Sequence, residues 1–496
     1  MNERNTENIK NADYAGAGGY ADNDGLPTGC DLNESDLPEC DLTEGGSISG
    51  GANGSAKPKK KRGKHSATFM SAMRGLVTGV VLLAVFFAGY LTNYFSVDAD
   101  LRSLQFVYNT YRDNYFFCDG TENPAKTLTE GLMDIYSEYY TADEYNAEQN
   151  AGKGRRKGYG ISFDGLTVFR VSGNSPAEKA GLKKGGRILA FKLNDGEFIS
   201  VEKQAELTSV LSAAKDSDKV ILRVDYAGDV KDFSMYKADY RESYVYYTDS
   251  TGCYRFNDDG GKMEINRYAD CDVALNDNFG YIKYVSFYGQ SNDSFGSVGQ
   301  ITAALDKMLA NGKTNLIIDL RDNGGGFMDI MCKLSGIFCP LPGGKTGDVA
   351  QIAEYRGSKK YSFKIDYSAA KNADREYYSA KIKKIVFLAN KNSASASEAL
   401  MGAVLDYDTA ARTDKVRVVL ESHVNDKGET IFKSYGKGIM QTTFVNKFSG
   451  EALKLTTARI VWPLSGTCIH GVGITTETDP RVFNAVGEII GFAQTI

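Results

Sequence analysis

"TNLIIDLRDNGGGFMDIMCKLSGIF", residues 314–338, contains a strand pattern, a loop and a helix pattern in the order that an α/β fold requires. The apolar run "NLIIDL" is typical of a buried strand, and "FMDIMCKLSGIF" has apolar residues at helical spacing. The order repeats at 383–407 as "KKIVFLA", "NKNSAS" and "ASEALMGAVLDY". Such units in series predict a mostly parallel sheet whose loops gather at the carboxyl ends of the strands. We therefore expect "RDNGGG" and "NKNSAS" to face each other.

Both loops carry residues that suit catalysis. A serine at a helix start lies at the positive end of the helix dipole, and the next backbone N–H points at the oxygen of an attacked carbonyl. The same serines could simply cap the helix. Gly324–Gly326 could form a tight turn or supply an N–H to an oxyanion.

The proton acceptor for such a serine is the harder question, because histidine is rare in this chain. The three histidines are His65, His423 and His470. Neither His423 nor His470 has an obvious orienting carboxylate in the sequence. A neutral lysine is the alternative, and its pKa must fall by roughly three units, on the order of 4 kcal/mol, through burial. Lys437, in "SYGKGIMQTTF", is the best candidate. A solvated strand lysine is the other interpretation.

Upstream of this α/β region the pattern is different. Residues 99–150, including "AKTLTEGLMDIYSEYY", have apolar and aromatic residues at helical spacing. From 158 to about 242, short alternating runs and two helical stretches predict a small β-rich domain. A hairpin-rich connector with "FNDDGGK" follows and leads to the α/β region from about 279. The predicted boundaries are a helical segment at 98–157, a β-rich domain at 158–245 and a larger domain at 246–496.

The N-terminus predicts a membrane anchor. Residues 1–56 are acidic and poor in large apolar side chains, so we expect a disordered tail, and a basic run follows at 57–74. Residues 75–97 carry no charge and are long enough for a helix to cross a membrane. A basic flank before such a span predicts a cytoplasmic tail and a large external part. A nuclear-localisation patch, a buried core helix and a cleaved signal peptide are the weaker interpretations.

Composition adds few constraints. A length of 496 residues with 42% hydrophobic residues predicts two or three folded units. A net charge of −5 gives no argument for nucleic-acid binding. The eight cysteines form no CxxC pair, which disfavours zinc. Cys253 and Cys271 could form a disulfide, but spacing does not decide the pairing.

Taken together, the motifs resemble the carboxyl-terminal processing (tail-specific) proteases of peptidase family S41, over about residues 102–480. The similarity runs in order through "GYGISF", "VSGNSPAEKAGLKKGGRILAF", "NLIIDLRDNGGG", "SASASE", "GKGIMQ" and "ALKLTTARIVWPLSGTCIHGVGI". It implies a multidomain α/β and α+β chain with a single transmembrane helix, a PDZ-like β-rich domain and a ClpP/crotonase-like α/β protease core.

The resemblance also implies roles for individual residues. Ser395 is expected to be the nucleophile, Lys437 the general base and Gln441 the residue that orients the lysine. The oxyanion hole would use the Ala396 N–H with that of Gly324 or Gly325. Ser393 and Ser397 are fallback nucleophiles. Asp406 matches an acidic position of the family, but it lies some 16 Å from Ser395 by helical rise, so we expect a structural role.

In the PDZ-like segment, the resemblance implies that Tyr159, Gly160 and Ile161 hold the C-terminal carboxylate of a substrate bound as an added strand. Three features depart from the family pattern. Arg187 replaces the usual aspartate, residues 407–436 are longer than usual and suggest an added hairpin or flap, and "GVGITTETDP" differs from the usual ending.

The sequence therefore predicts a membrane-anchored serine endopeptidase that acts outside the cytoplasm on proteins with apolar or unfolded C-terminal tails. No metal or organic cofactor and no nucleic acid is implied, and an oligomer or an activating partner stays open. An inactive PDZ scaffold that only binds peptides is the alternative. A hydrolase that depends on His423 or His470 is the second alternative.

Overall fold

The computed structural model describes residues 65–96, 98–116, 134–259, 262–267, 273–340 and 348–496. The chain divides into two units, residues 21–107 and residues 1–20 with 108–496, and each is described on its own. The predicted disordered tail and most of the basic run lie outside the described residues, as does Cys271.

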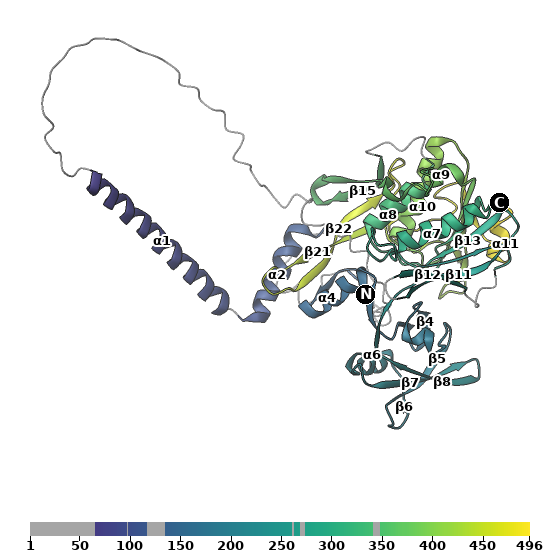
Figure 1. The fold of residues 1–496 in the computed structure, drawn as a ribbon, viewed down its shortest axis with the longest axis horizontal. Coiled ribbons are helices and arrows are strands. Elements are labelled where there is room, and N and C mark those ends of the chain that lie inside the picture. The colour runs from purple at the N-terminus through teal and green to yellow at the C-terminus, as the bar shows by residue number, and fades with distance from the viewer. Residues whose placement is uncertain (1–64, 97, 117–133, 260–261, 268–272, 341–347) are drawn as a thin grey trace, which may run out of the picture. The chain divides into compact units, whose positions relative to one another are not determined.

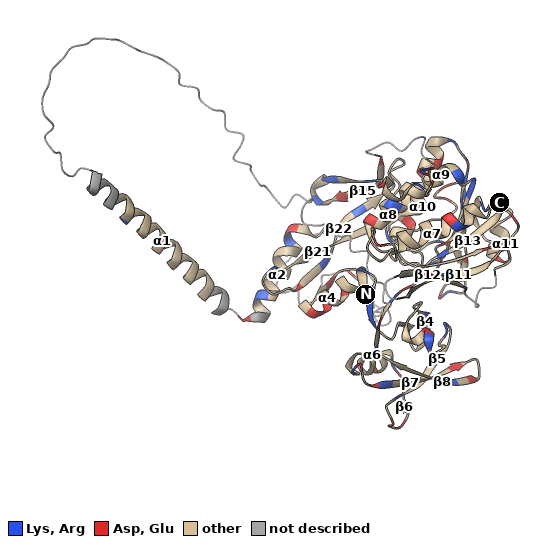
Figure 2. Ribbon diagram, in the orientation of Figure 1, with Lys and Arg blue, Asp and Glu red and all other residues tan. Residues whose placement is uncertain are grey.

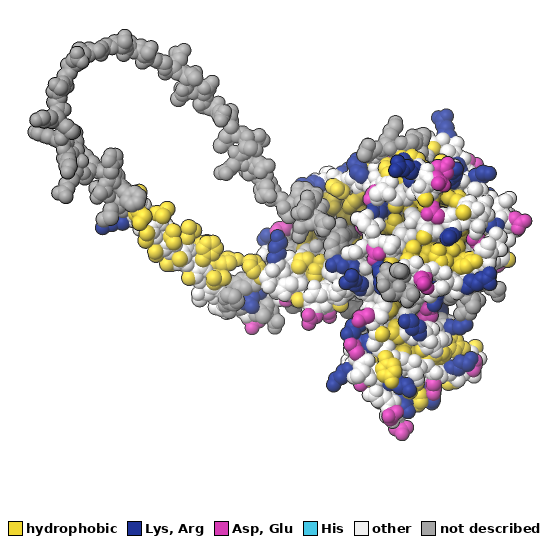
Figure 3. All heavy atoms as spheres, in the orientation of Figure 1, with side chains coloured by type: hydrophobic (Ala, Val, Ile, Leu, Met, Phe, Trp, Pro, Cys, Tyr) yellow, Lys and Arg dark blue, Asp and Glu magenta, His cyan; other side chains and the backbone are white. Residues whose placement is uncertain are grey.

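The smaller unit contains one long apolar helix, α1 (His65–Ser96). Within it, the 21 residues Ala72–Thr92 are long and apolar enough to cross a membrane, and none of this stretch is buried. At 1.5 Å per residue it is about 32 Å long, close to the thickness of a hydrocarbon core. Its side chains form an almost continuous hydrophobic surface in Figure 3. The predicted span 75–97 and this stretch share most of their residues.

The segment predicted to be helical from 98 to 157 is only partly so. Helix α2 (Ala99–Asn114) and helix α4 (Ala142–Gly152) agree with the prediction, and residues 117–133 lie outside the described part. The prediction that a helix continues through Tyr140 is wrong. Residues Glu138–Tyr140 form strand β1, which pairs antiparallel with β22 (Ala452–Val461). The aromatic residues there suit a strand, and the partner strand lies more than 300 residues away.

Residues 155–241 form a β-rich region with a core of its own, which includes Val168, Leu207 and Leu222. Its main sheet has the order β3-β4-β5-β7-β8, with β6 beside β5. The bounds are β2 (Arg155–Gly158), β3 (Ile161–Asp164), β4 (Thr167–Val171), α5 (Pro176–Lys179), β5 (Arg187–Leu193), β6 (Ile199–Ser200), α6 (Gln204–Ala213), β7 (Lys219–Tyr226), β8 (Asp229–Tyr236) and β9 (Ala238–Arg241). Strand β2 pairs with β9, so the predicted boundary at 158 divides β2.

An eight-stranded sheet organises the rest of the larger unit, in the order β12-β11-β10-β13-β14-β17-β18-β23. Its strands β11, β12 and β13 are labelled in Figure 1. The bounds are β10 (Val245–Asp249), β11 (Gly252–Asp259), β12 (Lys262–Arg267), β13 (Phe279–Tyr284), β14 (Asn315–Asp319), β17 (Lys384–Ala389), β18 (Val416–Leu420) and β23 (Val482–Asn484). From β13 to β23 all pairs are parallel, as the strand–loop–helix repeat predicted. The predicted hairpin connector is therefore part of this sheet.

Helices cover both faces of the sheet. Alternate strand residues such as Leu316 and Ile318 share one core with helices α7 (Ser297–Ala310), α8 (Met328–Phe338) and α10 (Ala396–Ala411). The intervening Ile317 belongs to a second core with α11 (Ile489–Ala493). This two-residue alternation is what a strand buried on both faces requires.

A second sheet has the order β1-β22-β15-β16, with β21 also paired to β22. Its further strands are β15 (Val349–Tyr355), β16 (Lys360–Lys364) and β21 (Ile439–Val445). The long 407–436 segment contains the hairpin of β19 (Ser422–Val424) and β20 (Thr430–Phe432), as expected. The remaining short elements are η1 (Arg356–Ser358), η2 (Tyr367–Ala369) and α9 (Tyr378–Lys381). Basic and acidic residues are interspersed over the ribbon in Figure 2.

Candidate active site

Ser395 lies where the loop after β17 turns into α10. Its φ is +55°, a left-handed conformation that costs a non-glycine residue about 1 kcal/mol or more. Its side chain is partly exposed and lines a pocket to which Lys437 also contributes. The strained turn therefore presents the hydroxyl at the N-terminus of α10, where the helix dipole favours negative charge.

The two fallback serines have structural partners instead. Ser393 is fully buried, and its Oγ donates to the Leu320 carbonyl (2.8 Å). Ser397 is also fully buried, and its Oγ donates to the Asn323 carbonyl (2.9 Å). These bonds fasten the loop after β17 to the loop after β14, so the two loops meet as predicted. Of the three serines, Ser395 is the one that lines the pocket.

The glycine loop lies directly against the Ser395–Ala396 peptide. Gly325 has a φ of +102°, and a Cβ on it would lie 2.8 Å from the Ala396 nitrogen, which excludes a side chain. The Gly325 N–H already donates to Asn323 Oδ1 (2.9 Å). Among the described residues, the N–H groups of Ala396 and Gly324 have no hydrogen-bond acceptor. This arrangement favours Gly324 over Gly325 as a partner of Ala396 in an oxyanion hole.

A buried ion cluster holds the start of that loop. Asp319 is fully buried, and its carboxylate accepts from the Tyr281 hydroxyl (2.6 Å) and from Arg321 Nη2 (2.7 Å). Burial alone would raise the pKa of Asp319, but the charges of Lys283 and Arg321 and these hydrogen bonds lower it to about 2. The cluster therefore stays ionised and fixes the direction in which the chain leaves β14.

Lys437 is a buried lysine with 6% of its surface exposed. Burial lowers its pKa from 10.5 to about 7, and the nearby Lys454 cation adds to the fall, while Asp134 and Glu398 oppose it. Its Nζ lies 4.8 Å from the centroid of the Tyr136 ring. Within the described part of the chain, Nζ makes no hydrogen bond or ion pair. A large fraction of this amine is therefore neutral near pH 7, as a general base requires.

Glu398, which was not predicted as a site residue, connects the serine to the lysine. Its fully buried carboxylate accepts from the N–H groups of Ser395 (3.0 Å), Gly436 (2.8 Å) and Lys437 (2.9 Å) and from the Ser434 hydroxyl. Burial raises the pKa of Glu398, and these hydrogen bonds oppose the rise. The available signal was the spacing Ser395-x-x-Glu398, which is that of a capping box.

Gln441 is buried in β21 at a bulge between Met440 and Gln441. Its Nε2 donates to Thr456 Oγ1 (3.0 Å), and its Oε1 has no partner among the described residues. Gln441 therefore does not form the predicted hydrogen bond to Lys437 in this structure. Its Oε1, four residues beyond the lysine, is free to accept one.

The remaining predicted residues lie apart from this pocket. No histidine is among the residues that line it; His423 lies on β19, and His470 follows β22, with its backbone against Gly438. Burial lowers the pKa of both imidazoles. Asp406 accepts from the N–H groups of Leu464 (2.8 Å) and Ser465 (2.9 Å), which is the structural role expected of it.

The predicted carboxylate loop of the β-rich region lies between β2 and β3. The N–H groups of Tyr159 and Gly160 donate no hydrogen bond within the described residues. Gly160 has a φ of +77°, and a Cβ there would lie 2.2 Å from Ser175 Cβ, so only glycine fits. Ile161 begins β3, opposite Val171.

The serine turn, the glycine loop and the buried lysine all contribute to one pocket. Residues 278–412 match the model of peptidase family S41, so the chain carries a domain of that family, as its motifs predicted. The match contains Ser395 and the glycine loop and ends before Lys437.

Known proteins are similar over a larger part of the chain. The "Probable CtpA-like serine protease" of Staphylococcus epidermidis is 27% identical over 385 residues, covering 76% of this chain and 64% of the relative. That of Staphylococcus aureus strain N315 is 26% identical over 384 residues, with the same coverage. The chain thus spans somewhat less than two thirds of these relatives.

Two solved structures are also similar. The photosystem II D1 C-terminal processing protease has a TM-score of 0.42 and 16% identity, covering 76% of this chain and 92% of that one. A putative S41 protease from Bacteroides fragilis has a TM-score of 0.46 and 15% identity, covering 77% and 90%.

Proposed function

We propose that this protein is a membrane-anchored serine endopeptidase of the carboxyl-terminal processing type, with Ser395 as nucleophile and neutral Lys437 as general base. The observation that carries the proposal is the shared pocket. Ser395 in its strained turn and Lys437, whose pKa burial lowers to about 7, line the same cavity. A base whose pKa is near the working pH is largely present in its neutral form and is still basic enough to accept the proton.

The chemistry follows from these positions. Lys437 Nζ takes the hydroxyl proton as Ser395 Oγ attacks the peptide carbonyl, and the oxygen of the tetrahedral intermediate accepts from the Ala396 and Gly324 N–H groups. One such donor contributes about 3 kcal/mol in serine proteases. The lysine ammonium then gives its proton to the leaving amine, and an acyl-enzyme remains. Water, deprotonated by the same amine, releases the second product and restores the serine.

Gln441 and Glu398 act as positioning residues in this proposal. The free Gln441 Oε1 is available to accept from the Lys437 ammonium as it forms, and Thr456 holds the other end of the amide. Glu398 fixes the backbone at both Ser395 and Lys437 through one carboxylate. The nucleophile and the base therefore keep their separation without a direct bond between their side chains.

The pocket supports an apolar substrate residue beside the cleaved bond. Its other walls include Met328, Ile439, Met440 and Ile460. We propose that substrates are proteins with apolar or unfolded C-terminal tails, and that the PDZ-like region binds the terminal carboxylate through the free N–H groups of Tyr159 and Gly160, with Ile161 beginning the strand that accepts the peptide.

The proposed location is outside the cytoplasm. The apolar stretch Ala72–Thr92 provides a single anchor, and the basic run before it favours a cytoplasmic N-terminus. Cys253 in β11 is disulfide-bonded, which supports an oxidising compartment for the larger unit.

The test compares variants of the full chain in detergent on an unfolded polypeptide that ends in apolar residues. We expect Ser395→Ala and Lys437→Ala to lose cleavage by at least a thousandfold while each variant still unfolds in one cooperative transition. A double variant, His423→Ala with His470→Ala, should keep activity. Cleavage by the Lys437→Ala variant would exclude Lys437 as the base. Loss of cleavage in the double histidine variant would favour the histidine-dependent hydrolase. Tail binding without cleavage by the wild type would identify an inactive scaffold.

A further inference from the structure

Residues 134–140, which were predicted to be helical and have no role in the proposed chemistry, lie beside Lys437. Tyr136 places its ring 4.8 Å from Lys437 Nζ. The Tyr136 hydroxyl donates to the Tyr435 hydroxyl (3.1 Å), and the two rings meet edge to face, with centroids 6.4 Å apart. Tyr136 is thus held against the loop that carries the base.

Strand β1 fixes this segment to the sheet that contains Gln441. Glu138 pairs with Lys454 in the ladder, and their side chains form an ion pair of 2.9 Å. The Ser137 hydroxyl accepts from the N–H of Thr456 (3.3 Å), the residue whose hydroxyl holds the Gln441 amide. The segment therefore contacts the surroundings of both the proposed base and its proposed orienting residue.

The groups around Lys437 Nζ have opposing effects on its charge. The carboxylates of Asp134 and Glu398 favour the ammonium, and the Lys454 cation disfavours it. The largest effect is burial, and the Tyr136 ring is part of that burial. The titratable groups packed nearby are Asp134, Tyr136, Glu398, Tyr435, Lys454 and His470.

We propose that Tyr136 is a positioning residue for the Ser395–Lys437 reaction, whose ring covers Nζ and keeps water from the amine that takes the serine proton. This inference rests on the proposed function. An aromatic face also attracts an ammonium, so the exclusion of water and the attraction of the ring predict opposite effects when the ring is removed. If exclusion of water is the larger effect, loss of the ring favours the charged amine.

The first experiment measures kcat/KM against pH for the full chain and three variants. Tyr136→Ala should move the acidic limb of the profile upward by about one pH unit or more, lower activity about tenfold at pH 7 and restore most of it at pH 9. Tyr136→Phe keeps the ring and should stay within about twofold of the wild type at every pH. Tyr139→Ala is the matched control, because its hydroxyl binds Glu451 and its loss disturbs β1 without uncovering Nζ. A limb that stays in place or moves downward in Tyr136→Ala, or moves equally in Tyr139→Ala, would overturn the inference.

A second experiment needs no cleavage. In a Ser395→Ala background, the pH dependence of urea unfolding with and without Lys437→Met reports the titration of Lys437. Adding Tyr136→Ala should raise the pKa of Lys437 obtained in this way by about one unit or more. If it does so in a protein whose wild type never cleaves, the proposed function fails while the role of Tyr136 as a cover stands. If the wild type cleaves but this titration stays in place, the role of Tyr136 fails alone.

Discussion

Lys437 shows how the surroundings of one side chain can lower the pKa of an amine. Burial removes water from its ammonium, and a second lysine, Lys454, lies near it. Both effects act against the charged amine, and neither requires a histidine. The proposed chemistry therefore depends on keeping water and anions away from a single nitrogen.

The same burial has a cost in stability that can be measured. The folded pKa of about 7 lies below the ordinary 10.5, so between these values the unfolded chain holds more protons and the folded state gains stability as the pH rises. We expect Lys437→Met to raise the free energy of unfolding by on the order of 4 kcal/mol at pH 6, with a difference that shrinks towards pH 10.

Urea unfolding at both pH values in a Ser395→Ala background checks this prediction. Lys427→Met, at an exposed position in the β19–β20 hairpin, should change neither value. A Lys437→Met variant that is less stable than its parent at pH 6 would contradict a neutral buried amine.

Lys454 provides a second prediction. Its cation lowers the pKa of Lys437, and its partner Glu138 is 55% exposed, so Glu138 stays solvated when the lysine is removed. We expect Lys454→Met to move the acidic limb of kcat/KM to higher pH, with activity recovering above it. Lys447→Met at the tip of the β21–β22 turn is the control. A limb that moves to lower pH would show that Lys454 does not act on Lys437 through its charge.

At the residue scale, the sequence predicted those site residues that a local sequence pattern marks. The helix start indicated a serine, the family resemblance selected Ser395, and the glycine-flanked strand identified Lys437. The structure brings Ser395 and Lys437 into one pocket. Glu398 was missed because its role depends on partners 36 to 39 residues away in sequence. The choice between Gly324 and Gly325 depends on the side chain of Asn323, which no motif reveals.

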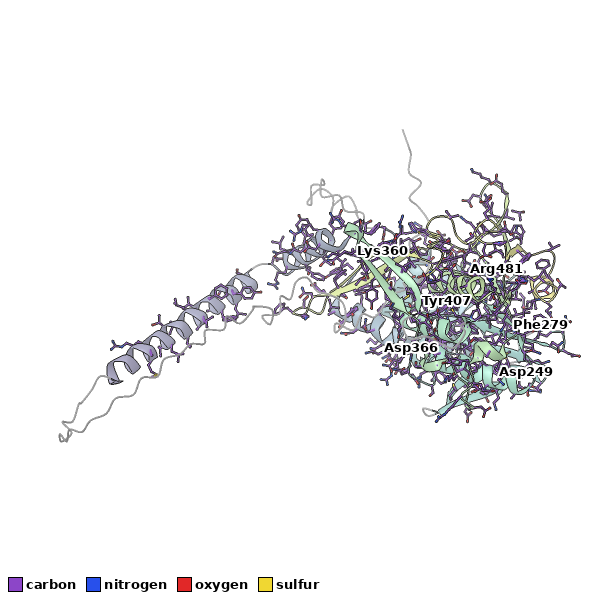
Figure 4. All side chains as sticks on the ribbon, turned by 90° about the horizontal axis from the view of Figure 1, so that it is seen from above. Asp249, Phe279, Lys360, Asp366, Tyr407 and Arg481 are labelled. Carbon is purple, nitrogen blue, oxygen red and sulfur yellow. The ribbon has the colours of Figure 1, made fainter. Side chains whose placement is uncertain are left out.

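At the scale of elements, the N-terminus of α10 is the point where two loops and one carboxylate meet. Buried hydroxyls of Ser393 and Ser397 hold the loop after β14, and Glu398 holds the loop before β21. Farther along α10, the Tyr407 hydroxyl, labelled in Figure 4, bonds to both backbone groups of Val349 in β15. The helix therefore connects the two sheets of the larger unit.

Glu398→Gln tests this connection. Three backbone N–H groups and one hydroxyl point at the carboxylate, so an amide nitrogen would face a donor wherever it turned. We expect kcat to fall by about a hundredfold, as small misplacements of reacting groups do, and the melting temperature to drop. Glu477→Gln, an exposed position, is the control. Full activity in Glu398→Gln would show that the two loops keep their places without the carboxylate.

The element pattern was predictable where strands and helices alternate, because the hydrophobic period changes within a few residues. The parallel order β13-β14-β17-β18 follows from it. The end of the helical segment was not predictable, since "EYY" fits a helix face as well as a strand, and β22, more than 300 residues away, decides. The β10–β12 hairpins were seen as a connector because an edge pairing leaves no local signature.

At the scale of the whole molecule, the apolar stretch of α1 precedes in sequence all the residues of the candidate site. We expect the full chain to stay with membranes through alkaline carbonate extraction, since about 20 apolar residues suffice for stable insertion. A variant without residues 1–97 should appear in the soluble fraction and cleave the same polypeptide as the full chain in detergent. Release of the full chain by carbonate would contradict a spanning helix.

Domain boundaries could be predicted from changes in composition and period only to within an element. The boundary at 245 falls at the first residue of β10, whose Val245 is already buried in the core of the larger sheet. The boundary at 158 divides β2 for the same reason. Composition changes where solvent exposure changes, and that is not where hydrogen-bonded ladders begin.

The C-terminal part of the chain completes the protein around α10. Arg481, labelled in Figure 4, binds the buried Asp408 across a separation of 73 residues, and β23 then joins the edge of the parallel sheet beside β18. During synthesis, the ribosome therefore releases Ser395 well before Lys437 and before Arg481, which binds α10 through Asp408. If Ser395 and Lys437 react as we propose, a nascent chain has no activated nucleophile until residue 437 packs beside α10.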